Sequence, residues 1–357
     1  MSKNKKRVTI INQDSGYLMI DTANAFVDAG YEVSLITGRL VKRNKTLKTE
    51  VTVQYITPYI RTSILKRFYS WIIGFAKIVW IVRRKHSKSH LFIVSNPPIA
   101  PFIPFFCKNS YSLLIYDVYI EKLEEFTLLG KKSPLVYFWK KAHKKSLKEA
   151  DSIFTLTDGM KEQLKKYSSG KQISVVPVWT DNDFLKPIEP AENPFVIDHK
   201  LKDKFIVLYS GNIGASSGVE NIVEFAKNIK CDRIIFLIIG DGLNKKIVEA
   251  KVREYKINNC VLLPWQSTDI LPYSLAAANL SIVSLINKSD NTSIPSKLFN
   301  YISVGSPILC LASEKSDLAK VVLKEKIGCV FQPDEIDKIV TYITKLSEDR
   351  SMAIKYS

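Results

Sequence analysis

Apolar runs of strand length and amphipathic stretches of helix length alternate along the chain. Residues 7–12 have the pattern of a buried strand, residues 18–29 have helical spacing and end before Gly30, and residues 32–37 predict a second strand. This order begins a doubly wound parallel sheet, in which ligands bind at the carboxyl ends of the strands. Further strands are predicted at 91–95, 113–116, 152–157 and 173–178.

Polar residues occupy loops that directly follow predicted strands. Because the carboxyl ends of parallel strands meet at one edge of a sheet, we expect these residues to share that edge. They are Asn12, Ser15 and Gly16 after the first strand, Asn96 after the strand at 91–95, and Asp117, Tyr119 and Glu121 after the strand at 113–116.

The second half of the chain repeats a strand followed by a ligand-type loop, with strands predicted at 205–209, 234–239, 261–263 and 281–285. Glycine directly after a strand lets a bulky ligand approach the backbone, and the following helix adds a favourable dipole. Four such strand ends predict a nucleotide site. The loop residues are Gly211, Asn212, Ile213 and Gly214, then Gly240, Asp241 and Gly242, then Trp265 and Gln266.

Residues 293–311 contain a helix start, a helix stop and a strand. Pro295 suits a first helical turn, Lys297 follows it, and Gly305 with Pro307 ends the helix before an apolar run at 308–311. A loop that enters a helix offers backbone N–H groups, and here a lysine, to a phosphate. Such units also occur throughout α/β proteins without a ligand.

The length of 357 residues accommodates two domains. Three prolines in the stretch 179–194 indicate a linker. We expect a first domain at 1–184, a linker at 185–204 and a second domain at 205–357.

The net charge of +17 predicts a partner that carries negative charge. Segments 61–88 and 131–148 combine basic and aromatic residues, and no carboxylate occurs between Glu50 and Asp117. The first segment predicts a helix with one continuous apolar face, which either lies on an anionic membrane or packs on the sheet beneath a solvated basic face. The apolar face comprises Leu65, Phe68, Ile72, Phe75, Val79 and Val82.

Several functional classes lack support in the sequence. The first loop lacks G-x-G-x-x-G, which argues against a dinucleotide-dependent oxidoreductase, and no recognised nucleic-acid motif accompanies the lysines. The five cysteines are scattered without metal-ligand spacing and indicate reduced thiols in a cytosolic protein. The N-terminus has no apolar segment of the kind that marks a secretion signal.

Four motifs of the second half together resemble family 4 glycosyltransferases, the retaining enzymes of GT-B fold, especially those of capsule and O-antigen synthesis. They are LYSGNIGASSGVENIVEFAK, FLIIGDGLNKK, VLLPWQSTDILPYSLAAANLSIVSL and IPSKLFNYISVGSPIL. The first half agrees more loosely, through SNPPIAPF, LIYDVYIE and ADSIFTLTDGMKEQL. The resemblance implies two Rossmann-like doubly wound domains that face a central crevice. The crossover helix that usually ends such chains is not recognisable here.

The resemblance also implies a donor site for a nucleotide-diphosphate sugar, with UDP favoured over GDP. The diphosphate would lie at 211–214 and at Ser296 and Lys297, while the base and ribose would contact 240–242, Trp265, Gln266 and Asn300. The two acids of the E-x7-E pattern are replaced by Thr292 and Asn300, and no basic residue follows the first glycine loop. Lys297 would then carry more of the charge stabilisation.

The implied reaction transfers a hexosyl or N-acetylhexosaminyl group with retention to a polyprenyl-diphosphate-linked saccharide at the inner membrane face. Lys297 would stabilise the departing diphosphate, and neither a metal nor another cofactor would be required. Asp117 would orient the acceptor or the sugar, although a capping role is an equal alternative. Acceptor contacts would come from Asn12, Ser15, Gly16, Asn96, Tyr119 and Glu121. The protein would be cytoplasmic and peripheral to the membrane.

Two other functions remain open at this stage. A nucleotide-sugar epimerase of the same fold would convert the donor without an acceptor. A non-catalytic membrane-surface partner in a polysaccharide assembly complex would fit the missing acids.

Overall fold

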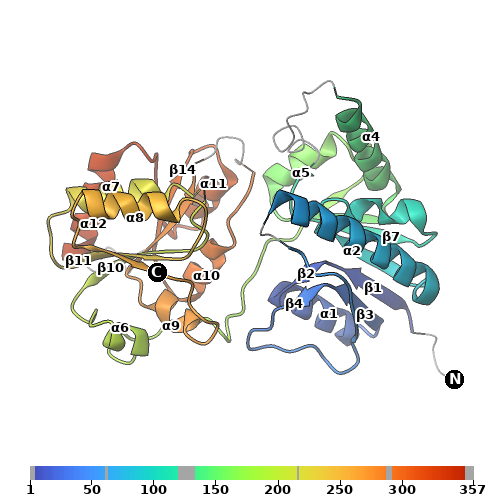
Figure 1. Ribbon diagram of the computed structural model, residues 1–357, viewed down its shortest axis with the longest axis horizontal. Helices are drawn as coiled ribbons and strands as arrows, with labels where there is room; N and C mark the ends of the chain where they lie inside the picture. Colours follow the sequence, from blue (N-terminus) through green and yellow to red (C-terminus); the bar gives the residue numbers. More distant parts are fainter. Residues whose placement is uncertain (1–4, 61–62, 120–132, 215–216, 287–291, 350–357) are drawn as a thin grey trace. The chain divides into compact units, whose positions relative to one another are not determined.

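The computed structural model describes residues 5–60, 63–119, 133–214, 217–286 and 292–349, and the chain divides into two compact units (Figure 1). The first unit comprises residues 1–177 and the second comprises residues 178–357. The division falls after Pro177, so the residues expected to form a linker belong with the second unit. There, Asn193 caps the short helix α6 (Pro194–Asp198), whose Phe195 and Val196 are buried.

The first unit contains a seven-stranded parallel sheet in the order β5-β3-β1-β6-β7-β8-β9. The strand order reverses its direction between β1 and β6, as in a doubly wound sheet. The strands are β1 (Arg7–Ile11), β3 (Glu32–Thr37), β5 (Thr52–Tyr55), β6 (His90–Val94), β7 (Tyr111–Ile115), β8 (Ser152–Thr155) and β9 (Ile173–Val175). The short strands β2 (Asp14–Ser15) and β4 (Arg39–Leu40) pair separately.

Helices cover both faces of this sheet because its central strands carry buried apolar side chains in both directions. On one face, Met19 and Ala23 of α1 pack over β1 and β3. On the other, Ile78 and Val82 of α2 and Leu147 of α4 pack over β6 and β7. The helices are α1 (Tyr17–Asp28), α2 (Ile64–Lys85), α4 (Pro134–Glu149) and α5 (Asp158–Lys165), with a 3-10 helix η1 (Ala100–Phe106) beside α2 and α4.

The six residues predicted to form one apolar face lie at steps of three and four along the unbroken helix α2, as predicted, but that face is not buried along its whole length. Val82 is fully buried, but Leu65 and Ile72 are 82% and 62% exposed. The C-terminal part of this face therefore packs against the core of the first unit, whereas its N-terminal part is exposed. Within the described chain, no helix has both the length and the apolar character needed to cross a bilayer.

The second unit contains a six-stranded parallel sheet in the order β12-β11-β10-β13-β14-β15. The order reverses between β10 and β13, which is where a doubly wound sheet opens a crevice at its carboxyl edge. The strands are β10 (Phe205–Ser210), β11 (Ile234–Ile239), β12 (Cys260–Leu263), β13 (Leu280–Leu285), β14 (Ile308–Ala312) and β15 (Gly328–Phe331). The predicted doubly wound α/β class is therefore confirmed in both units.

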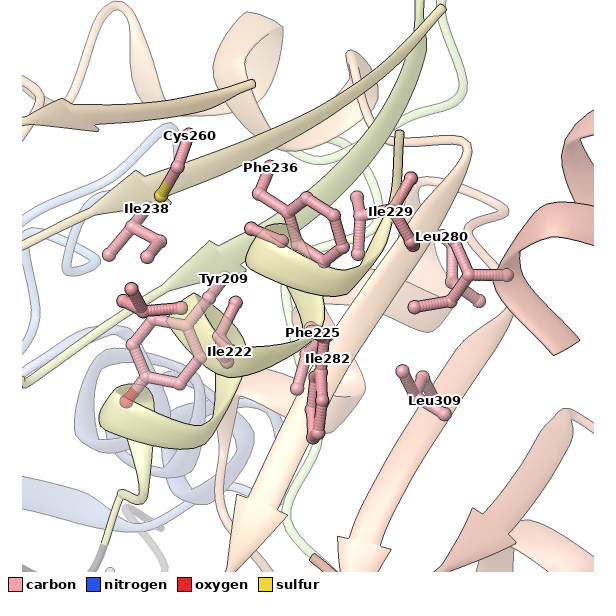
Figure 2. Packing of buried hydrophobic residues seen from close by; sticks show 14 of the residues in the cluster. Tyr209, Ile222, Phe225, Ile229, Phe236, Ile238, Cys260, Leu280, Ile282 and Leu309 are labelled. Atoms are coloured by element: carbon pink, nitrogen blue, oxygen red, sulfur yellow. The ribbon is translucent and has the colours of Figure 1, made fainter. Parts of the chain in front are cut away.

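Two layers of helices enclose the second sheet (Figure 1). Figure 2 shows Ile222 and Phe225 of α7 beside Tyr209, Phe236 and Ile282 of neighbouring strands. The first layer contains α7 (Val219–Asn228), α8 (Lys245–Glu254) and α12 (Ile336–Glu348), and the second contains α6, α9 (Leu271–Ala276), α10 (Lys297–Ser303) and α11 (Asp317–Lys324). All five cysteines are free thiols, as predicted.

Candidate functional site

The two glycine loops of the second unit lie against each other at the carboxyl ends of β10 and β11. The amide of Gly211 donates to the carbonyl oxygen of Ile239 at 2.9 Å, and the amide of Ile213 donates to that of Asp241 at 2.8 Å. A Cβ atom added to Gly240 would lie 2.0 Å from the carbonyl oxygen of Gly211. The loops thus meet backbone to backbone, and a side chain does not fit between them.

Lys297 lies beside the first of these loops. It is the first residue of α10, and its Nζ atom lies 3.8 Å from the centre of the Tyr209 ring. A Cβ atom on Gly211 would lie only 2.7 Å from the same Nζ. The sequence prediction that brought Lys297 to the glycine loop is therefore reproduced in three dimensions.

The ammonium group of Lys297 has an unusual environment. Among the described residues, no carboxylate lies within ion-pair distance of it, and burial lowers the pKa of Lys297 to about 7. Burial disfavours the charged form because the protein replaces water without supplying a counter-ion. An anion that entered this place would restore the charge and its stabilisation.

Two buried tyrosines hold the strand and the loop that lie next to Lys297. The hydroxyl of Tyr301 in α10 accepts from the amide of Ser210 at 2.7 Å and donates to the carbonyl of the same residue at 3.1 Å. The hydroxyl of Tyr209 donates to the carbonyl of Asn212 at 2.8 Å. Sequence reasoning missed both residues, because each one fits the apolar pattern of its strand or helix.

The remaining predicted donor residues lie at the same carboxyl edge or on α10. The Oδ1 atom of Asn300 accepts from Thr180 at 2.9 Å, an interaction across 120 residues of sequence. Ser296 is exposed in front of α10, and Trp265 is 54% exposed after β12. Gln266 donates to the carbonyl of Pro264 at 2.8 Å. The side chain of Asp241 accepts from the amide of Gly242 at 2.8 Å.

The residues predicted from the first unit follow three adjacent strands, β1, β6 and β7. Asp117 accepts from the hydroxyl of Tyr119 at 3.1 Å. Ser15 is buried, and its hydroxyl donates to the carbonyl of Asn12 at 3.1 Å. Asn96 lies partly buried at the end of β6, and Gly16 precedes α1. Glu121 lies outside the described residues.

Gln13 was not among the predicted residues, yet it connects the loops at this edge. Its amide donates to the carbonyls of Thr57 at 2.9 Å and Ser70 at 2.8 Å, and its backbone N–H donates to Asn96 at 3.0 Å. A Cβ atom on Gly74 of α2 would lie 2.6 Å from the same amide. A sequence pattern could not reveal this role, because its partners are distant in the chain.

Comparisons with known proteins agree with the motifs of the second half. Residues 192–357 match the family described as glycosyl transferases group 1. The chain is 26% identical over 218 residues to the putative colanic acid biosynthesis glycosyl transferase WcaI of Escherichia coli K12, covering 59% of this chain and 54% of WcaI. It is 21% identical over 252 residues to the probable glycosyltransferase WbjE of Pseudomonas aeruginosa, covering 70% and 62%. The chain thus spans little more than half the length of these relatives.

Solved structures share the fold over almost the whole chain. WaaG, a glycosyltransferase involved in lipopolysaccharide biosynthesis, has a TM-score of 0.71 at 12% identity, covering 98% of this chain and 92% of WaaG. Anabaena HepE in complex with UDP-glucose has a TM-score of 0.68 at 12% identity, with coverage of 98% and 92%. The expected resemblance to glycosyltransferases is therefore supported: residues 192–357 match the glycosyl transferases group 1 family, and the chain shares the GT-B fold of these solved structures.

Proposed function

We propose that the chain is a retaining glycosyltransferase that uses a nucleotide-diphosphate sugar. The observation that carries this proposal is the juxtaposition of the Lys297 ammonium with the loop at Gly211, where strand order reverses. A diphosphate needs positive charge and close approach to the backbone, and this edge supplies both without a bulky side chain in the way. UDP is the favoured nucleotide, because HepE, which shares the fold, binds UDP-glucose.

The proposed reaction depends on stabilisation of the departing diphosphate. As the bond from the sugar to the diphosphate breaks, negative charge grows on the phosphate oxygens, and Lys297 neutralises part of it. Asp117 of the first unit orients the acceptor hydroxyl, with its own carboxylate held by Tyr119. In this proposal the charge of Lys297 and the loop amides suffice without a metal ion.

The proposed acceptor is a polyprenyl-diphosphate-linked saccharide at the inner face of the membrane. Two observations support this part of the proposal: WcaI and WaaG are named for polysaccharide and lipopolysaccharide synthesis, and the first unit has a basic surface with exposed aromatic rings. The proposed process is therefore assembly of a capsule, an O-antigen or a related exopolysaccharide.

Titration of UDP and GDP sugars tests the donor site. Lys297→Ala removes a charge-assisted contact of about 1.5–3 kcal/mol, so we expect a more than tenfold loss of UDP-sugar affinity. Lys324→Ala is the matched control, because Lys324 is an exposed lysine of the same unit whose nearest acid is its neighbour Glu325. Equal affinity of the wild-type protein and Lys297→Ala would contradict the role given to Lys297.

Product analysis separates the three functions that the sequence left open. Transfer of sugar to a lipid-linked acceptor, with release of nucleoside diphosphate, is the expected result. Conversion of the donor in the absence of acceptor would indicate an epimerase instead. Donor binding without either reaction would indicate a non-catalytic partner in an assembly complex.

We further propose that α2 and α4 contact an anionic membrane surface. Both helices display apolar or aromatic side chains to solvent beside lysines and arginines, and aromatic and cationic residues favour the bilayer interface. The exposed side chains are Leu65, Phe68, Tyr69, Ile72 and Trp80 on α2, Phe105 and Phe106 on η1, and Tyr137 and Phe138 on α4.

Flotation with vesicles tests this surface. We expect binding to vesicles rich in anionic lipid, and a loss of binding at high salt because exposed charges are screened within about 10 Å at 0.1 M ionic strength. Changing both Ile72 and Trp80 to serine should weaken binding, whereas Ile247→Ser on the second unit, at a site 51% exposed, should not. Equal flotation of both variants would contradict the assignment.

A further inference from the structure

Tyr209 contacts both the lysine and the glycine loop of the proposed donor site. It is fully buried, and its ring faces the ammonium of Lys297 at 3.8 Å while its hydroxyl reaches the carbonyl of Asn212 at 2.8 Å. One side chain therefore contacts both groups to which a diphosphate would bind. No motif assigned a role to this position, because it resembles any apolar residue of a buried strand.

The path of the lysine side chain is confined on two sides. Cε and Nζ of Lys297 would lie 3.0 and 2.7 Å from a Cβ atom on Gly211, so the chain passes directly over that glycine. The ring of Tyr209 lies on another side of the ammonium. The negative face of an aromatic ring attracts a cation, and this attraction increases where water is excluded. Among the described residues, the ring of Tyr209 rather than a carboxylate therefore contacts the ammonium.

An aromatic ring and a carboxylate beside a lysine have opposite effects on how well that lysine binds an anion. A carboxylate would hold the lysine firmly but would repel a diphosphate and compete with it. A neutral ring holds the ammonium in position and leaves its N–H donors available to the ligand.

Comparison with Tyr301 shows that burial alone does not account for the contact between the Tyr209 ring and Lys297. Both tyrosines are fully buried and both hydroxyls bond to the backbone at the end of β10. Of the two rings, only that of Tyr209 has a cation–π contact with Lys297 among the described interactions. Tyr301 therefore serves as a matched comparison for a role in packing.

We propose that Tyr209 is a positioning residue that holds the Lys297 ammonium at the glycine loop and so gives the site its affinity for a diphosphate. This inference rests on the proposed function, because it assigns a partner to the same donor site. Its effect is specific to the phosphate groups, so the affinity for the nucleoside alone does not depend on it.

Calorimetric titration with UDP and with uridine tests the inference. Tyr209→Leu removes the ring, and we expect UDP affinity to fall about tenfold while uridine affinity changes less than about twofold. Tyr209→Phe keeps the ring, so UDP affinity should remain within about threefold. Tyr301→Phe should leave the ratio of UDP to uridine affinity unchanged.

A double-mutant cycle with Lys297→Ala distinguishes positioning from packing. If Tyr209 acts through the lysine, Tyr209→Leu costs less than about twofold in UDP affinity once Lys297 is alanine. Full additivity of the two losses would overturn the inference. Failure of the wild-type protein to bind UDP or GDP sugars would instead overturn the proposed donor site, so the two failures are distinguishable.

Fluorinated phenylalanines at position 209 provide a test that does not depend on how well Tyr209→Leu folds. Fluorine withdraws charge from the ring face with little change in size, so UDP affinity should fall steadily as fluorine atoms are added. Thermal unfolding of each variant serves as the control for folding. Affinity that is independent of fluorination would overturn the inference.

Discussion

The two units have the same kind of parallel sheet, but their carboxyl edges differ in chemistry. In the second unit, glycine loops leave the backbone bare, and Lys297 lies beside them without a described carboxylate partner. In the first unit, side chains fill the corresponding edge: Gln13 and Ser15 are buried and hydrogen-bonded to the surrounding loops. The shared fold fixes where a site can form, and the residues at the strand ends decide which ligand it suits.

This contrast suggests a division of tasks. A bare backbone with a cation suits a diphosphate, whereas carboxylate, amide and hydroxyl groups suit a saccharide with many hydroxyls. The second unit is thus the proposed donor unit and the first the proposed acceptor unit.

Gly240→Ala should destabilise the second unit by about 3 kcal/mol or more, because the new Cβ atom would collide with the carbonyl of Gly211 at 2.0 Å. Gly16→Ala, at the N-cap of α1 in the first unit, is the matched control: no atom lies within 4 Å of its added Cβ, so we expect only the cost of alanine at an N-cap, about 1 kcal/mol or less. Urea unfolding measures both. Similar losses in the two variants would mean that the two edges do not differ in packing.

Asp117→Asn should lower the turnover number by about a hundredfold or more while leaving UDP-sugar affinity unchanged. The substitution keeps the size of the side chain and its contact with Tyr119 but removes the charge that is proposed to orient the acceptor. Steady-state kinetics with varied donor and acceptor separate the two effects. A loss of donor affinity equal to that of Lys297→Ala would break the proposed division between the units.

Donor binding should take up about one proton at pH 8, where a lysine with a pKa of about 7 is mostly neutral and must become charged beside the diphosphate. Calorimetry in buffers with different ionisation enthalpies measures this number. The uptake should vanish in Lys297→Met. Uptake of the same size in that variant would assign the proton to another group.

The same lowered pKa also affects the stability of the ligand-free second unit. Between pH 7 and the ordinary lysine value of 10.5, the unfolded chain holds more protons at this residue than the folded one. The contribution of Lys297 to stability therefore rises with pH across that window and falls as the pH drops toward 7. Urea unfolding of wild type and Lys297→Met at pH 7 and pH 9.5 should show the smaller gap at pH 9.5.

Much of the fold could be predicted from the sequence because most strands are uninterrupted apolar runs bounded by turn residues. The strands at residues 32–37 and 234–239 coincide with β3 and β11. The strand at 173–178 ends earlier than predicted, at Val175, because the apolar pattern does not mark the last ladder hydrogen bond. The change from exposure to burial along α2 could not be predicted, since it depends on what packs against each turn.

The candidate site was predictable where backbone chemistry determines it. Glycine after a strand and lysine at the start of a helix can both be recognised in a single sequence. The sequence therefore placed Gly211 and Lys297 at one site, and the structure brings them together. The partners of Asn300 and Gln13 could not be predicted, because Thr180 and Ser70 reach them across long stretches of chain. Tyr209 was missed although its partners are close in the chain or at the predicted site, because it fits the apolar pattern of an ordinary buried strand.

The contact between the glycine loops also limits how the sequence can change over evolutionary time. Gly240 leaves no room for a side chain beside Gly211, and Gly242 leaves none beside Ile213, where an added Cβ atom would lie 2.4 Å from the carbonyl oxygen. Replacing glycine in one loop would therefore displace the other loop, so one substitution would disturb the conformation of both. The two loops are almost thirty residues apart in the chain. We expect substitutions in one loop to be accompanied by substitutions in the other, or both loops to remain unchanged.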